Sequence, residues 1–184
     1  MPDSAHQPRS PPAHIRLGGG AVTDVVARMF FELWPDAALT EHREEAALIL
    51  AATRPSTLPL MVFVAEANDK IVGLIEVALR SHADGCDAGR PVGFIEGWYV
   101  EPTHRGIGVG GALMQAAEDW ARSQGCHELA SDTWNDHESS KRVHEVLGFE
   151  VVDRCVHFRK CSAMTISSEI DSSKKRARPP PLRT

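Results

Sequence analysis

A run of closely spaced glycines constrains the fold of this chain more than any other part of its sequence. Residues 104–113, HRGIGVGGAL, carry glycine at positions 106, 108, 110 and 111, directly before a stretch with the apolar spacing of a helix. Glycine is unfavourable inside helices, so this crowding needs a local reason. A turn without Cβ atoms either exposes its N–H groups to an anion such as phosphate or allows close helix packing, and the spacing alone leaves both explanations open.

The elements expected around this turn alternate between strands and helices. Residues 60–67 and 70–82 are rich in Val and Ile and flank Asn68 and Asp69, which predicts an antiparallel hairpin. The full predicted order is a strand at 14–18, helices at 23–34 and 40–53, strands at 60–67, 70–82 and 92–100, a helix at 108–125, a strand at 126–133, a helix at 138–148 and a strand at 149–160. This order predicts an α/β fold with helices on both faces of one mixed sheet.

The length of 184 residues suits one domain, which we expect over residues 14–161. The N-terminus lacks a basic region followed by an apolar core, and no apolar run reaches the length of a membrane span. We therefore expect a cytoplasmic protein without a membrane partner. Residues 1–13 and the basic, proline-rich residues 162–184 are expected to be disordered tails.

Charge is divided unevenly along the chain. The formal net charge is −5, but residues 162–184 carry +3 and residues 1–14 are balanced, so residues 15–161 hold −8. An acidic domain favours cationic partners and argues against nucleic acid, although it is also compatible with a merely soluble surface. The four cysteines form no CxxC pair and the nine histidines no HExxH motif, so no metal site is predicted.

Two familiar nucleotide-binding patterns fit the glycine segment poorly. A Walker loop ends in Gly-Lys-Ser/Thr, whereas Gly110 is followed here by Gly111 and Ala112. Gly106, Gly108 and Gly111 have the spacing of a Rossmann fingerprint, but they follow an antiparallel hairpin and lie past the middle of the chain. Neither pattern explains the segment.

The segment resembles the acyl-CoA-binding signature of the GNAT superfamily of N-acetyltransferases. That signature is Arg or Gln, any two residues, Gly, any residue, and Gly or Ala, and it is satisfied by Arg105, Gly108 and Gly110. The resemblance implies a mostly antiparallel sheet whose splayed central strand pair, at 92–100 and 126–133, holds acetyl-CoA, with the Val100 N–H as an oxyanion donor. The acetyl-CoA contacts that it implies are Tyr99, Val100, Arg105, Gly106, Ile107, Gly108, Val109, Gly110, Gly111 and His137.

Within that superfamily the chain looks most like the bacterial aminoglycoside 6'-N-acetyltransferases. The resemblance rests on ELWP at 32–35, GCD at 85–87, FIEGWYV at 94–100, GC-x-E-x-ASDT at 125–133 and KRVHEVLGFE at 141–150. It implies transfer of acetyl from acetyl-CoA to the 6'-amino group of an aminoglycoside by direct attack in a ternary complex, and it implies a homodimer. Other classes remain open, namely acetylation of a polyamine or a protein amine, and a non-catalytic acyl-CoA-binding module.

Carboxylates are the groups expected to receive a polycationic acceptor. Glu96 and Asp132 lie on the two strands expected to splay, so we predict that they face the amine and that one of them accepts its proton. The sequence does not choose between them. Trp34 either packs on a sugar ring or belongs to the core, and Asp87 either joins the acidic pocket or is a solvated turn residue.

Two histidines occupy positions that matter in the superfamily. His144 lies where many members carry a tyrosine, shortly before the Gly148–Phe149 pair. It can protonate the CoA thiolate near neutral pH, or it can simply pack the helix. His137 stands where the family often has Asn, so this chain departs from the usual pattern on the CoA side.

Overall fold

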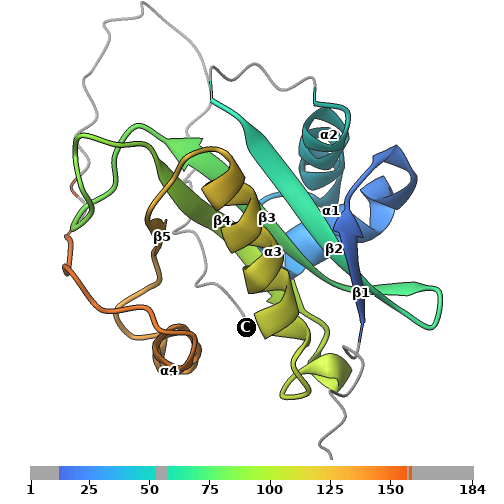
Figure 1. Ribbon diagram of the computed structural model, residues 1–184. Helices are drawn as coiled ribbons and strands as arrows, with labels where there is room; N and C mark the ends of the chain where they lie inside the picture. Colours follow the sequence, from blue (N-terminus) through green and yellow to red (C-terminus); the bar gives the residue numbers. More distant parts are fainter. Residues whose placement is uncertain (1–12, 53–57, 157, 159–184) are drawn as a thin grey trace, which may run out of the picture.

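The computed structural model describes residues 13–52, 58–156 and 158 (Figure 1). The elements are β1 (His14–Leu17), the 3-10 helix η1 (Gly20–Val22), α1 (Thr23–Leu33), α2 (Leu39–Leu50), β2 (Leu60–Ala67), β3 (Lys70–Arg80), β4 (Val92–Val100), the 3-10 helix η2 (Pro102–His104), α3 (Val109–Ser123), β5 (Leu129–Ser131) and α4 (Glu138–Val146). The predicted order of strands and helices is therefore confirmed as far as α4.

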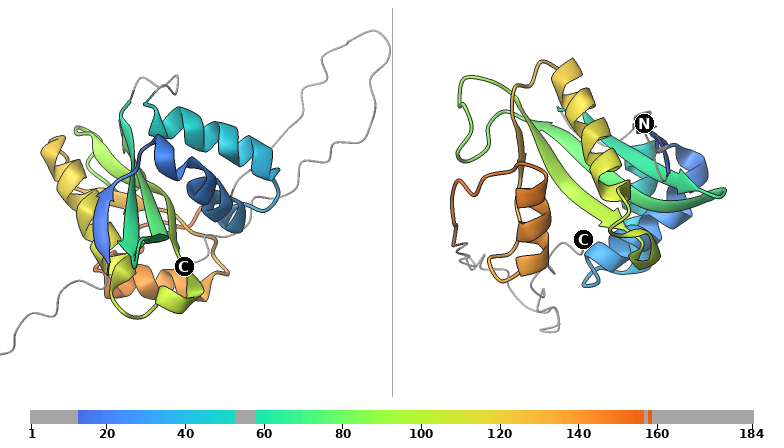
Figure 2. Two further views of the ribbon diagram at one scale, coloured as in Figure 1. Left: turned by 90° about the vertical axis from the view of Figure 1, so that its right-hand side faces the viewer. Right: turned by 60° about the horizontal axis from the view of Figure 1, so that its bottom comes forward.

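One five-stranded sheet runs in the order β1-β2-β3-β4-β5. The first four strands pair antiparallel, and β5 joins β4 in parallel. Helices α1 and α2 cover one face and α3 covers the other (Figure 2). The expectation of a mixed, mostly antiparallel sheet between helices is confirmed.

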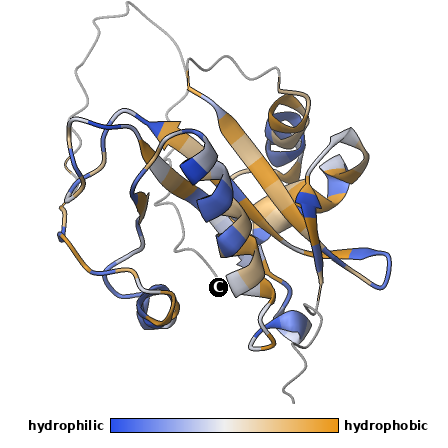
Figure 3. Ribbon diagram, viewed as in Figure 1, coloured by the Kyte–Doolittle hydropathy of each residue, from blue (hydrophilic) through white to orange (hydrophobic). Residues whose placement is uncertain are grey.

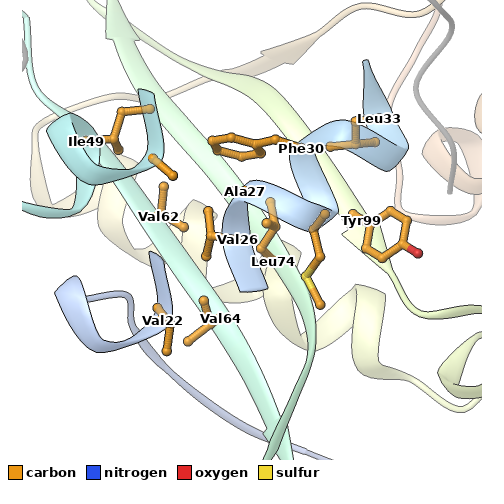
Figure 4. Packing of buried hydrophobic residues seen from close by; sticks show 12 residues of the cluster. Val22, Val26, Ala27, Phe30, Leu33, Ile49, Val62, Val64, Leu74 and Tyr99 are labelled. Carbon is orange, nitrogen blue, oxygen red and sulfur yellow. The ribbon is translucent and has the colours of Figure 1, made fainter. Parts of the chain in front are cut away.

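Each face of the sheet has its own apolar core. Helix α1 presents Val26, Phe30 and Leu33 at helical spacing, and all three are fully buried against the strands (Figure 4). On the other face, Leu113, Met114 and Ala117 of α3 are buried against residues that include Ile75 and Ile95. Figure 3 shows the polar side of α3 turned away from the sheet.

A bulge divides β4 into two halves. In its pairing with β3, Glu76 lies opposite Gly97 and Val77 opposite Ile95, so Glu96 is the extra residue. Because side chains alternate along a strand, an extra residue reverses which positions face which helix. Ile95 and Trp98 both face α3, whereas Tyr99 faces α1.

The prediction of a strand at 149–160 is wrong for the part of that segment that the structure describes. Residues 149–156 and 158 have no regular secondary structure, and β5 covers only three residues of the strand predicted at 126–133. Val151, Val156 and Phe158 are 60%, 72% and 93% exposed. High strand propensity is not sufficient without a neighbouring strand to pair with, so β5 lies at the edge of the sheet described here instead of inside it.

Some sequence predictions fall outside the described residues. These are the disordered tails expected at 1–13, except Ala13, and at 162–184. Among the described helices, none combines the length and the apolar character that crossing a bilayer requires.

Candidate functional site

The strands β4 and β5 stop pairing next to the two predicted carboxylates. Their last paired residues are Ile95 and Ser131, so Glu96 and Asp132 are the next residue on each strand. Glu96 is the bulge residue of β4, and Asp132 follows the end of β5. The structure thus brings these two residues to the point where the strands separate, as the sequence predicted for their strands.

The backbone of Val100 faces the side of β4 that β5 has left. Glu101 N–H donates to the Val72 carbonyl at 2.8 Å, and hydrogen-bonded pairs alternate along an antiparallel ladder. The neighbouring pair of Gly73 and Val100 is therefore a non-hydrogen-bonded one, so the Val100 N–H points away from β3. This direction fits the predicted oxyanion donor.

The glycines of the loop before α3 have different local reasons. Gly106 and Gly108 have φ of +72° and +98°, a region that disfavours side chains, and a Cβ at Gly106 would meet nothing within 4 Å. At Gly110 a Cβ would lie 2.9 Å from Cζ2 of Trp98, so this glycine permits close packing of α3 on β4. Close helix packing is thus the reason for Gly110, whereas anion binding by the N–H groups at the other positions stays a prediction.

The start of α3 has the donors that a pyrophosphate needs. Gly108 is its N-cap and provides no side chain to cap the first turn, so the N–H groups that follow have no side-chain acceptor there. Ile107 beside them is 54% exposed. The N–H groups of residues 106–111 would hold the pyrophosphate of CoA, which supplies the activated acetyl group as a thioester.

Arg105 and Tyr99, both predicted to contact acetyl-CoA, are engaged within the protein. Arg105 Nε donates to the Val100 carbonyl at 2.8 Å. The Tyr99 ring is buried against α1, and its hydroxyl donates to Glu101 at 3.3 Å. Burial, followed by the negative charge of Glu101, raises the pKa of Tyr99 above its ordinary value. The side chain of Tyr99 therefore supports the α1 core, and its contact with acetyl-CoA stays a prediction.

Glu96 has a cationic partner that the sequence analysis missed. Arg80 at the end of β3 donates from Nε and Nη2 to the two carboxylate oxygens of Glu96, at 3.0 and 2.7 Å. The Arg80 guanidinium carbon also lies 3.3 Å from the ring centre of Phe94. Finding this pair requires the β3–β4 register and the bulge, neither of which the residue pattern reveals.

Trp34 lies on the same face of β4 as this pair. A Cβ at Gly97, next to Glu96, would lie 2.8 Å from Cη2 of Trp34. The indole also packs on Phe30, with ring centres 5.4 Å apart, and its carbonyl bonds to the His42 ring at 2.8 Å. Trp34 is thus partly core, and it borders the predicted acceptor site at the same time.

Asp87 lies at the other end of β5 from Asp132. Its N–H donates to the Glu128 carboxylate at 2.7 Å, and Glu128 precedes β5 whereas Asp132 follows it. The Asp87 side chain accepts from Gly89 N–H and pairs with Arg90 at 3.6 Å. These contacts match the solvated turn residue that the sequence offered as the alternative.

His144 connects α4 to β5. Its Nδ1 lies 2.8 Å from the Ser140 carbonyl, which can only accept, so Nδ1 donates and Nε2, 3.0 Å from Ser131 Oγ, is free to accept in the neutral ring. The ring lies edge-on to Trp98 and Phe149. His144 therefore packs the helix, and protonation of a CoA thiolate by it stays a prediction.

His137 is the N-cap residue of α4. Its ring nitrogen Nε2 lies 3.3 Å from Ser139 Oγ. Among the residues that the structure describes, no three His, Cys, Asp or Glu side chains gather as a metal site would require.

Comparisons with known proteins agree with this geometry. The sequence profile described as the acetyltransferase (GNAT) family matches residues 21–149. The chain belongs to the acetyltransferase (GNAT) family. As a GNAT protein it is 43% identical over 130 residues to the aminoglycoside N(6')-acetyltransferase type 1 of Klebsiella aerogenes, which covers 70% of this chain and 84% of that protein. The protein of the same description from Stenotrophomonas maltophilia is 42% identical over 135 residues, with 72% and 83% covered.

Solved GNAT structures give the same result. The structure of AAC(6')-Iy in complex with the bisubstrate analog CoA-S-monomethyl-acetylneamine has a TM-score of 0.73 and 31% identity, covering 82% of this chain and 99% of that one. AAC(6')-Ig from Acinetobacter haemolyticus has a TM-score of 0.72 and 28% identity, with 82% and 99% covered. The expected fold family is thereby confirmed.

Proposed function

We propose that this GNAT protein is an aminoglycoside 6'-N-acetyltransferase that uses acetyl-CoA. The observation that carries the proposal is the position of Glu96 and Asp132, one on each strand, where β4 and β5 stop pairing. Two carboxylates at the open end of a strand pair suit a polycationic acceptor. The relatives at 43% and 42% identity bear the name of this activity, and the bisubstrate analog bound by AAC(6')-Iy joins CoA to an acetylneamine.

The residues divide the reaction between two faces of β4. Glu96 or Asp132 accepts a proton from the amine, which attacks the thioester carbonyl only when it is unprotonated. The Val100 N–H donates to the oxyanion that forms. The N–H groups of residues 106–111 bind the pyrophosphate, with Arg105, Tyr99 and His137 as further contacts, and His144 returns a proton to the departing thiolate. Trp34 borders the sugar, and Asp87 contributes negative charge from farther away.

A CoA-release assay over kanamycin, tobramycin, spermidine and a peptide tests the proposal. We expect turnover with the aminoglycosides, and mass spectrometry with NMR should locate the acetyl group on the 6'-nitrogen. Turnover with spermidine or the peptide alone would replace the proposal with the polyamine or protein acceptor. Binding of CoA without turnover on any amine would indicate a non-catalytic acyl-CoA-binding module.

Matched carboxylate variants test the assigned roles. Glu96→Gln and Asp132→Asn should both lower kcat/KM for kanamycin, and the variant that removes the proton acceptor should lower it by about a hundredfold, because general acid–base catalysis contributes at least that much. The affinity for CoA, measured by calorimetry, should change little. Glu66→Gln is the control, since Glu66 also pairs with an arginine but lies on β2, with its partner Arg16 on β1. Unchanged kinetics in both site variants would remove these residues from the mechanism.

We also propose that the protein is a cytoplasmic homodimer whose catalytic domain spans residues 14–161. The exposed apolar side chains after α4, namely Val151, Val152, Val156 and Phe158, support a partner surface. The outer strand of the described sheet, β5, supports it too. Analytical ultracentrifugation should find twice the mass of one chain. Val156→Asp should shift the protein toward the monomer, and a monomeric wild type would contradict the proposal.

A further inference from the structure

Arg80 holds one of the two candidate carboxylates in a fixed position. It donates to both oxygens of Glu96, at 3.0 and 2.7 Å, and its guanidinium lies over the Phe94 ring at 3.3 Å from the centre. Strand alternation explains this arrangement. A Cβ at Gly93 would meet Ala121 of α3, so Phe94 and Glu96 point to the opposite face. Because the guanidinium stacks on Phe94 with its face and donates two hydrogen bonds to Glu96 with its edge, it has little freedom to move.

The Arg80–Glu96 pair has no net formal charge, whereas an ionised Asp132 carries a charge of −1. Arg80 cancels the formal charge of Glu96, whereas in the part of the chain described no ion pair involves Asp132. An ionised carboxylate has about four lone-pair sites, of which Arg80 occupies two. The Glu96 side chain is 28% exposed, so the remaining sites can accept hydrogen bonds from a ligand.

These two carboxylates therefore suit different donors. Asp132 attracts an ammonium group by charge. Glu96, neutralised and fixed, is suited to a directional hydrogen bond from a hydroxyl or an amine. An acceptor that carries ammonium and hydroxyl groups on one rigid ring satisfies both, whereas a linear polyamine offers no hydroxyl and benefits only from uncompensated negative charge.

From this geometry we infer that Arg80 is a specificity-determining positioning residue, which acts through Glu96 to favour amino sugars over linear polyamines. The inference rests on the proposed function and extends it to the choice of acceptor. Removing Arg80 leaves Glu96 mobile, which weakens the directional hydrogen bond to hydroxyl-bearing ligands, and uncompensated, which attracts both kinds of polycation. For the amino sugar the gain in charge is offset by the lost hydrogen bond, whereas for the polyamine it is not, so the preference moves toward polyamines.

The test measures dissociation constants of CoA-saturated protein for kanamycin and spermidine by calorimetry, with kcat/KM for each. In Arg80→Met the ratio of the spermidine constant to the kanamycin constant should fall about tenfold, the effect of one lost charge-assisted hydrogen-bonded contact. Arg80→Lys keeps the charge without the paired hydrogen bonds, so its ratio should lie nearer that of the wild type. A loss of folding alone would weaken both ligands and leave the ratio unchanged.

Arg16→Met is the matched control. Arg16 pairs with Glu66 at 2.6 Å, and its side chain is 38% exposed against 41% for Arg80. We expect the control to keep the wild-type ratio. If Arg80→Met does not fold, as judged by thermal unfolding, Arg80→Gln takes its place.

Three results would overturn the inference. They are a ratio within twofold of the wild type in Arg80→Met, a ratio in Arg80→Lys as low as in Arg80→Met, and an equal shift in Arg16→Met. A wild-type protein that acetylates no aminoglycoside would instead overturn the proposed function. The two failures are therefore distinguishable from the wild-type assay alone.

Discussion

Two sides of the molecule, which meet where Ile95 of β4 pairs with Ser131 of β5, are stabilised in different ways. On one side, strands β1 to β4 and helices α1 to α3 contain both apolar cores. On the other side, every residue of β5 is only partly buried, and Ser140 is the one fully buried residue of α4. Glu96 thus belongs to a well-packed region, whereas Asp132 follows a strand that is only partly buried, near α4, whose apolar residues Val143 and Leu147 are also only partly buried. The two candidate carboxylates therefore differ in how firmly the fold positions them.

Identical truncations on the two sides test this difference most strongly. Leu33 is fully buried in α1, and Leu147 at the end of α4 is partly buried. Leu33→Ala should lower the free energy of unfolding by about 3 kcal/mol, and Leu147→Ala by about 1 kcal/mol, because less apolar surface and a smaller cavity are involved. Urea denaturation measures both. Equal losses would show that α4 is packed as firmly as α1.

Two glycines at the start of α3, the N-cap Gly108 and Gly111 in the first turn, should respond oppositely to alanine. Gly108 needs φ of +98°, so Gly108→Ala should cost about 1–2 kcal/mol of stability. A Cβ at Gly111 would meet only Leu147 Cδ2 at 3.8 Å, so Gly111→Ala should raise stability by about 0.5–1 kcal/mol through helix propensity. Thermal unfolding with calorimetric ΔH gives both values. A stabilising Gly108→Ala would contradict the geometry of the loop.

The His144 contacts test how α4 is held. His144→Phe keeps the aromatic contacts with Trp98 and Phe149 but loses the hydrogen bonds to Ser131 and Ser140, at a cost of about 1 kcal/mol. Hydrogen exchange of the α4 amides should accelerate, while that of the β2 to β4 amides should not. His82→Phe, in an exposed loop, is the control and should leave both unchanged. Uniform acceleration would mean that the two sides unfold together.

The smallest expected effect concerns the pH dependence of the well-packed side. Tyr99 has a raised pKa because of burial and then Glu101, so its neutral form is favoured in the folded state. This contribution to stability is complete below the ordinary tyrosine pKa of about 10, and it is lost as pH rises through the raised value. Tyr99→Phe should remove that part of the decline. Because Tyr99 is the single tyrosine of the chain, ultraviolet difference spectroscopy follows its ionisation directly, and ionisation near pH 10 would contradict the prediction.

The sequence predicted the elements well where local pattern decides structure. The apolar spacing of α1 and α3, the Asn68–Asp69 hairpin and the glycine turn depend on neighbours in the chain, and all were found. The separation of the two strands beside Glu96 and Asp132 was instead implied by the family resemblance, and Asp132 lies just after β5. The elements themselves require only the preferences of consecutive residues.

Features that depend on distant partners were missed. Residues 149–160 have the composition of a strand, but no neighbouring strand pairs with the described part of them. Arg80 is 16 positions from Glu96, and their contact follows from the β3–β4 register. The reason for Gly110 is the ring of Trp98, which no turn pattern indicates. Pairing, register and close packing are decided by the assembled sheet.

The bulge at Glu96 also determines which side chains of β4 face α1 and which face α3. Deleting Glu96 would remove the bulge without changing the faces, because Gly97 would then follow Ile95 opposite Glu76, and the Trp98 and Tyr99 rings would stay where they are. Pairing Glu96 with Glu76 in a regular ladder would instead exchange the environments of every residue after it, sending the Tyr99 ring toward α3 and the Trp98 ring toward α1. The extra residue is therefore what allows Ile95 and Trp98, three positions apart, to face the same helix.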